Sequence, residues 1–193
     1  MNKMTNSKTT MIHKINSKYL KAVGAAWLRY ELKCPLVTFE RGIWHWCYTP
    51  DILGVRTTGY SVEIEVKVSW KDFKANFDKR CIKTRKFIKD DYHPSSMYFI
   101  VPPELVDKVG NSGLLTDEGL LTINDNINTY TGLHQISEVR KPKRRKSEKL
   151  TIGQLAKLVR CQSNTLISIA SSEVRNDMLR PIRKSSDEVK EWE

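Results

Sequence analysis

The chain has 193 residues, of which 39% are hydrophobic and 28% are charged, and its formal net charge is +11. This length and hydrophobic content suffice for one domain of about 120 to 150 residues with extensions. No apolar run approaches the ~20 residues that a membrane-spanning helix requires, and no signal peptide is recognisable. We therefore expect a soluble, cytoplasmic protein without a membrane partner.

The first thirty positions contain basic but no acidic residues, because Glu31 is the first acid in the chain. The Asn-, Thr- and Ser-rich start predicts a flexible arm over residues 1–16. An organellar targeting sequence is the alternative, although Lys predominates where Arg would be expected. Between residues 17 and 32, apolar and aromatic residues recur at helical spacing, which predicts an amphipathic helix packed on a sheet.

A meander of short strands is predicted next, over residues 36–40, 43–48, 51–56 and 61–69. In the last of these strands the apolar residues occupy alternate positions. Glu63, Glu65 and Lys67 therefore share the opposite face. Like charges that close together on one face repel each other, and a divalent cation would relieve the repulsion.

The first residue of the preceding strand, Asp51, can bring a third carboxylate beside Glu65. Sites built from carboxylates, a backbone carbonyl and water suit Mg²⁺ or Mn²⁺. Water activated by such a cation beside Lys67 is a candidate nucleophile for phosphodiester hydrolysis. The alternative is a surface strand whose Glu and Lys side chains pair across the sheet.

The order of Pro50-Asp51, a turn at Thr57-Thr58-Gly59 and the triplet Glu65-Val66-Lys67 resembles the PD-(D/E)XK nuclease superfamily. The segments EIEVKVSWKDFKANFDKR, SMYFIVPPEL and GLLTDEGLL look like its MmcB-like DNA repair branch, and the likeness covers about residues 37–123. The resemblance implies an α/β fold with a restriction-endonuclease-like core, in which helices flank a mixed central sheet.

The same resemblance implies that Asp51 and Glu65 are metal ligands, with the Val66 carbonyl as a third, and that Lys67 positions or activates water. An acid from an earlier element often completes such sites. Glu40 is preferred for this role because the branch has a Glu in the strand before its Asp.

Glu31 is the other candidate for the additional acid. Glu63 departs from the minimal pattern of the superfamily, and three roles remain open for it: a ligand, a partner of Lys67 or a solvated side chain.

A basic helix is predicted over residues 70–89, starting beside the Lys67 end of the strand. Its cations could hold a phosphodiester backbone against the metal. The alternative is that they simply occupy an exposed helix face, where Lys and Arg are common. The candidate DNA contacts on this helix are Lys71, Lys74, Lys79, Arg80 and Lys83.

A buried strand is then predicted over residues 97–101, followed by Pro102-Pro103 and a short helix over residues 104–109. The sequence Gly-Leu-Leu-Thr occurs at residues 113–116 and again at residues 119–122. This repeat predicts two short strands joined by a tight turn, which closes a domain spanning residues 17–138.

Residues 139–150 form a basic linker, with seven basic residues and one acidic residue between Arg140 and Lys149. A run of like charges cannot bury itself, so we expect a solvated segment that becomes ordered on a polyanion. The alternative is a linker that serves solubility alone. The candidate DNA contacts here are Arg144, Arg145 and Lys146.

Residues 151–193 are predicted to be a helical tail whose layout resembles a helix-turn-helix, with Arg160-Cys161 in the turn. Its second helix would offer Gln162, Asn164 and Thr165 to DNA bases. A helical hairpin that packs on the core or mediates self-association is the alternative, and a homodimer remains open.

Together these features predict a Mg²⁺-dependent (or Mn²⁺-dependent) deoxyribonuclease, an endonuclease rather than an exonuclease, that acts in DNA repair, recombination or processing. Two other classes compete with this hypothesis. One is a non-catalytic nucleic-acid-binding protein on a nuclease-like scaffold, and the other is an adaptor whose basic run docks on an acidic protein.

Overall fold

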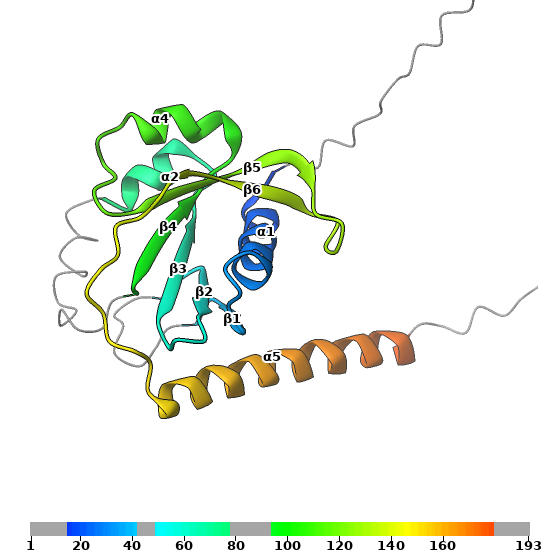
Figure 1. The fold of residues 1–193 in the computed structure, drawn as a ribbon. Helices are drawn as coiled ribbons and strands as arrows, with labels where there is room; N and C mark the ends of the chain where they lie inside the picture. The colour runs from blue at the N-terminus through cyan, green and yellow to red at the C-terminus, as the bar shows by residue number, and fades with distance from the viewer. Residues whose placement is uncertain (1–14, 42–48, 78–93, 180–193) are drawn as a thin grey trace, which may run out of the picture.

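A computed structural model describes residues 15–41, 49–77 and 94–179, and it contains a mixed six-stranded sheet with strand order β1-β2-β3-β4-β5-β6 (Figure 1). Neighbouring strands are antiparallel except for the parallel pairs β3–β4 and β4–β5. The strands are β1 Leu36–Phe39, β2 Ile52–Val55, β3 Ser61–Val66, β4 Ser96–Ile100, β5 Gly119–Ile127 and β6 His134–Arg140. Helices flank this sheet, which confirms the expected α/β class.

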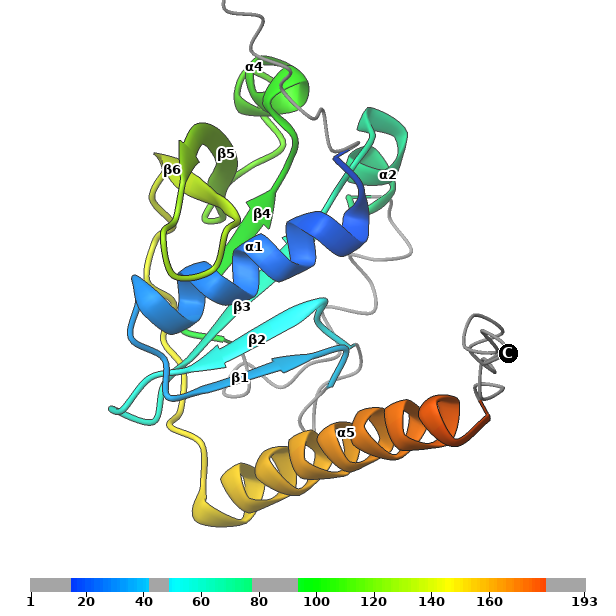
Figure 2. The same cartoon turned by 90° about the vertical axis from the view of Figure 1, so that its right-hand side faces the viewer.

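One face of the sheet is covered by α1, Ser17–Tyr30 (Figure 2). Asn16 caps the helix, because its Oδ1 accepts a hydrogen bond from the Tyr19 amide at 2.9 Å. The apolar stripe of α1, including the fully buried Leu20, packs against the alternate side chains of β3, such as Ile64. The amphipathic helix predicted from residue 17 is therefore confirmed, although it ends at Tyr30.

The other face is covered in two separate regions. Beside β4 and β5 lie α2 (Trp70–Ala75), the 3-10 turn η1 (Pro103–Leu105) and α4 (Val106–Gly110), which pack around Phe73 and Phe99. Beside β1 and β2, Leu158 of the helix α5 (Ile152–Leu179) packs on Leu53 and Val55. On this face the charged side chains of β3 therefore lie between two apolar clusters.

The predicted hairpin over residues 113–122 is wrong. Residues 113–118 contain no strand, whereas the second Gly-Leu-Leu-Thr begins the long strand β5. β5 pairs with β4 on one side and with β6 on the other, and the sequence analysis did not predict β6. Gly119 allows this crowding, because a Cβ there would lie 2.4 Å from the Tyr98 ring and 2.9 Å from the Arg140 carbonyl oxygen.

Some predicted elements fall outside the described residues. These are the strand over residues 43–48 and most of the helix over residues 70–89, of which the structure describes α2 and the two residues after it. The arm over residues 1–16 also lies outside, apart from its last two residues.

The expected turn at Arg160-Cys161 is wrong, because α5 is one continuous helix from Ile152 to Leu179. A helix-turn-helix is therefore not formed. Residues in the first half of this helix contact the sheet. Leu158 is 2% exposed, and Gln162 Nε2 donates a 3.1 Å hydrogen bond to the Val37 carbonyl of β1. Further along, Leu166 and Ile167 are exposed.

The basic segment between β6 and α5 was expected to be a solvated linker, but the structure shows it hydrogen-bonded to the domain. Backbone amides of Lys143, Arg145 and Leu150 donate to the carbonyls of Asp117, Ser95 and Gly59 at 2.8 to 2.9 Å. The Arg145 guanidinium also forms a 2.7 Å ion pair with Glu118, which is 5% exposed. A like-charge run can be held in this way because its backbone amides bond to the domain and several of its charged side chains meet an acid or an aromatic ring.

The Glu118–Arg145 pair should contribute measurably to stability. Replacing Arg145 with Ala leaves a buried carboxylate without its cation, so we expect the free energy of unfolding in urea to fall by about 1.5 to 3 kcal/mol. The neighbouring Arg144→Ala, which removes an exposed guanidinium, is the matched control and should have a smaller effect. Equal losses in the two variants would show that the ion pair contributes nothing specific.

Candidate functional site

The candidate site lies where β2 begins and β3 ends. Asp51 directly precedes β2, and its Oδ2 accepts a 2.9 Å hydrogen bond from the backbone amide of Val66. In the antiparallel register Ile52 pairs with Ile64, so Asp51 comes to lie beside Glu65. The expected approach of these two carboxylates is therefore present, and a backbone hydrogen bond holds it in place.

Lys67 completes the group. Its Nζ lies 3.3 Å from Glu65 Oε2 and 3.9 Å from Asp72 Oδ1, at the start of α2. The side chains of Glu65 and Lys67 are both only 11% exposed. Ser69 caps α2 by accepting a hydrogen bond from the Asp72 amide at 3.2 Å, which sets the helix start beside the Lys67 end of the strand. Asp51, Glu65 and Lys67 thus converge as the sequence predicted.

These residues do not belong to a surface strand, which was the alternative interpretation, because all six residues of β3 are buried. Glu63 is 0% exposed, and a hydrogen bond between its side chain and that of Glu65 stabilises the ionised Glu65. Glu63 is therefore a buried neighbour of Glu65. Of the three roles left open for Glu63, that of a solvated side chain is excluded.

Burial is the largest influence on Glu65 and raises its pKa above the ordinary value of 4.5. The charge and hydrogen bond of Lys67 act in the opposite direction, whereas the nearby charge of Asp51 raises the pKa further. The net result is an upward shift. An ionised Glu65 is thus costly at this position, and a cation placed between it and Asp51 would lower that cost.

Sequence reasoning missed Lys21 of α1. Its Nζ lies 2.6 Å from Glu40 Oε1 and 2.8 Å from Asp51 Oδ1, so one ammonium joins both carboxylates. Burial acts to lower the pKa of Lys21, but the hydrogen bonds and charges of Asp51 and Glu40 outweigh it and raise the pKa above 10.5. A single Lys on an amphipathic helix carries no signal of such a long-range contact.

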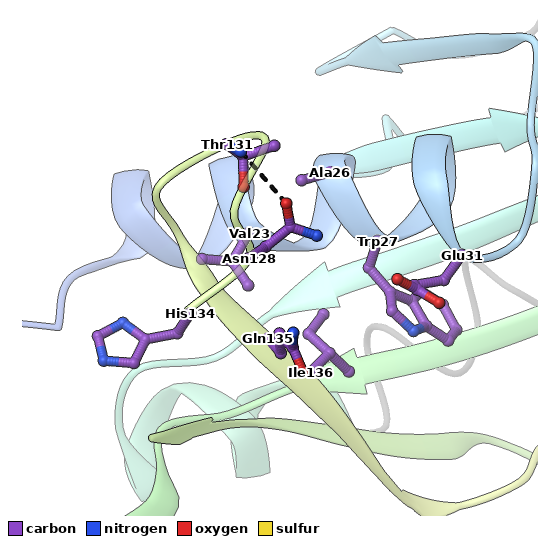
Figure 3. A pocket seen from close by; sticks show the side chains of 9 residues that line it. All are labelled: Val23, Ala26, Trp27, Glu31, Asn128, Thr131, His134, Gln135 and Ile136. Carbon is purple, nitrogen blue, oxygen red and sulfur yellow. Dashed lines mark hydrogen bonds between the residues drawn. The ribbon is translucent and has the colours of Figure 1, made fainter. Parts of the chain in front are cut away.

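The two candidates for the additional acid occupy different places. Glu40 follows β1 and is connected to Asp51 through Lys21, although its side chain is 68% exposed. Glu31 lies ten residues after Lys21, or about 15 Å further along the helix direction. It lines a hollow of about 160 Å³ between α1 and the β5–β6 hairpin, near Trp27 (Figure 3). The geometry thus favours Glu40 over Glu31.

Two carboxylates and a backbone carbonyl are the oxygen donors available for a cation, from Asp51, Glu65 and Val66. Within residues 15–41, 49–77 and 94–179, no group of three or more His, Cys, Asp or Glu side chains is arranged to hold a metal ion. Mg²⁺ is often held by one or two carboxylates with water completing its shell. The donor chemistry therefore fits a hard divalent cation.

The predicted DNA contacts are distributed over both ends of the sheet. Lys71 and Lys74 are exposed on α2, near the carboxylates. Arg144 and Lys146 are exposed on the segment between β6 and α5, whereas Arg145 is engaged with Glu118. The remaining three candidates, Lys79, Arg80 and Lys83, lie outside the described residues.

Comparison with known proteins gives a structural likeness alone. No family model and no curated protein matches the chain. A solved structure described as "SPO1766 protein of unknown function from Silicibacter pomeroyi" is similar to 89% of this chain and 99% of its own, with a TM-score of 0.50 and 18% identity. The likeness supports the α/β fold. Within the described ranges, no helix has the length and apolarity needed to span a bilayer.

The raised pKa of Glu65 predicts how stability depends on pH. A carboxyl whose pKa is higher in the folded state favours folding while it is protonated, and this contribution is lost as the pH rises above about 4.5 through the folded-state pKa. Glu65→Gln cannot ionise, so its free energy of unfolding relative to the wild type should increase from pH 4 to pH 8 in urea titrations.

The matched control for this titration is Glu104→Gln, on an exposed turn. It should follow the wild-type pH dependence. A Glu65→Gln variant that loses stability relative to the wild type as the pH rises would contradict the assignment, since it would mean that the ionised form of Glu65 favours folding.

Proposed function

We propose that this protein is a Mg²⁺-dependent deoxyribonuclease built on a restriction-endonuclease-like core. The observation that carries the proposal is the hydrogen bond from the Val66 amide to Asp51 Oδ2, because it holds Asp51 beside Glu65 and Lys67 at one end of the sheet. This is the arrangement implied by the likeness of Asp51, Glu65, Val66 and Lys67 to the PD-(D/E)XK pattern.

Each residue has a role that follows from its position. Asp51, Glu65 and the Val66 carbonyl would hold the cation, which when bound polarises a phosphoryl oxygen and acidifies water. Lys67 lies 3.3 Å from Glu65, where its ammonium can orient a water molecule or neutralise charge on the phosphate. Lys21 fixes the orientation of Asp51 through its 2.8 Å ion pair and links Glu40 to the site.

DNA is the proposed substrate and endonucleolytic cleavage the proposed reaction, as part of repair, recombination or processing. The net charge of +11 and the exposed Lys71 and Lys74 on α2 beside Lys67 support a polyanionic substrate. Phosphate contacts of this kind hold the backbone in register without reading its sequence. Mn²⁺ would satisfy the same oxygen donors.

A non-catalytic nucleic-acid-binding protein is the second candidate, and one observation favours it. Lys67 is paired with Glu65, Lys21 is paired with Asp51 and Glu40, and Glu63 is hydrogen-bonded to Glu65. The acids of the site are thus already compensated by groups of the protein itself. A scaffold of this kind would bind DNA without hydrolysing it.

Cleavage assays separate the two candidates. End-labelled duplex, single-stranded, flap and junction DNA would be incubated with the full chain in Mg²⁺, in Mn²⁺ and in EDTA. We expect cleavage only with metal, and a fall of roughly 100-fold or more in rate for Asp51→Asn and for Lys67→Ala, because the first weakens the hold on the cation and the second removes a positive charge beside the reacting phosphate. DNA binding should persist in both variants.

Lys18→Ala is the matched control for Lys67→Ala, because it removes one exposed Lys from the first turn of α1. Its cleavage rate should equal that of the wild type. DNA binding without metal-dependent cleavage of any substrate in the panel would instead identify the non-catalytic candidate. Absence of both binding and cleavage would leave only the adaptor hypothesis.

A further inference from the structure

A second cavity lies at the end of the sheet opposite to the carboxylates. Its volume is about 380 Å³. It is formed where β2 ends and β4 begins, together with the residues that follow α1 and part of the segment between β6 and α5. The residues that line it are Leu32, Lys33, Arg56, Thr57, Thr58, Tyr60, Ser95, Ser96 and Arg144.

The lining is positively charged. Lys33, Arg56 and Arg144 contribute three cations, four Ser and Thr hydroxyls add hydrogen-bonding groups, and the lining includes no Asp or Glu. Guanidinium groups present several N–H donors in a fixed plane that matches the oxygens of a phosphate, and hydroxyls can donate to the same oxygens. The chemistry of the cavity therefore complements a phosphate group.

The three cations have no carboxylate partner among the described residues. Lys21, Lys67 and Arg145 each form an ion pair with an acid. No acid of the described ranges lies within ion-pair distance of the three cations that line the cavity. A bound anion would therefore attract all three cations and stabilise the arrangement.

The backbone around the cavity is held in place. Arg56 and Tyr60 form a closed turn, in which the Arg56 amide donates to the Tyr60 carbonyl and the Gly59 amide donates to the Arg56 carbonyl, both at 2.9 Å. Gly59 has a φ of 86°, a conformation that favours glycine. Lys33 likewise has a positive φ of 55°, at the point where the chain leaves α1 for β1.

The third cation is brought to the cavity by the basic segment. The Arg144 guanidinium lies 4.9 Å from the centre of the Tyr60 ring. The next residue, Arg145, donates its amide to the Ser95 carbonyl at 2.9 Å and forms its ion pair with Glu118. The docking of this segment thus brings Arg144 to the same cavity as Arg56, although the two residues are far apart in sequence.

We propose that this cavity is a phosphate-binding site, separate from the carboxylate site and independent of a divalent metal. The five residue steps from Asp51 to Arg56 along β2 separate the two sites by about 16 Å. The volume exceeds that of one phosphate group, so the phosphate can belong to a larger molecule. It comes either from a nucleic-acid backbone or from a free phosphate compound, and both present the same oxygens.

Binding measurements on the full chain in EDTA test the proposal without any dependence on catalysis. The probes are inorganic pyrophosphate, followed by calorimetry, and a fluorescent 12-nucleotide single-stranded DNA, followed by anisotropy at low salt. The test variant is the double substitution Arg56→Gln and Arg144→Gln. We expect it to weaken the binding of at least one probe by roughly tenfold or more, as the loss of charge-assisted hydrogen bonds implies.

The matched control is the double substitution Lys18→Gln and Lys108→Gln, which removes two exposed cations that do not line the cavity. It should retain nearly all affinity. Should the test variant fail to fold, as judged by its urea transition, Lys33→Gln replaces one exposed lining cation and should also weaken binding.

The two probes distinguish the sources of the phosphate. If the test variant loses only pyrophosphate binding, the natural ligand is a free phosphate compound. If it loses only DNA binding, the ligand is a nucleic-acid backbone. Loss of both shows that the cavity binds the phosphate oxygens that the two probes share. Two results would overturn the proposal. One is no binding of either probe by the wild type, and the other is an equal loss of affinity in the test and control variants. Neither depends on whether the protein cleaves DNA.

Discussion

A single backbone hydrogen bond organises the charged end of the sheet. Because Asp51 accepts from the Val66 amide, the carboxylate that precedes β2 is fixed beside the last residues of β3. Lys21 then joins Asp51 to Glu40, which ties α1 to the same end. Lys67 lies next to this contact in the chain and is held by its own ion pair with Glu65.

The burial of β3 explains why its charged residues are unusual. All six residues of the strand are buried, with apolar side chains directed to α1 and the acids placed on the other face between two apolar clusters. Keeping acids in such surroundings costs free energy that Val or Ile would not cost. Glu63, Glu65 and Lys67 therefore reduce the stability of the fold at these positions. Their presence there is consistent with the chemical role that we propose.

Local patterns predicted local geometry well and long-range contacts poorly. Alternation in residues 62–68 and the position of Asp51 before a strand were enough to predict that Asp51, Glu65 and Lys67 meet. The contact of Lys21 with Asp51 depends on how α1 lies on the sheet, which periodicity does not encode. The turn predicted at Arg160-Cys161 failed because neither residue breaks a helix, so a polar stretch continued as α5.

The placement of α5 also has a consequence for the rim of the sheet. Among the described residues β1 is an outermost strand, and strands in that position can recruit an extended segment from another molecule through their unpaired backbone groups. Gln162 occupies the Val37 carbonyl with a side-chain amide, and Leu158 anchors the helix close by. The tail thereby occupies one backbone acceptor on this four-residue border, so that acceptor is already engaged within the chain.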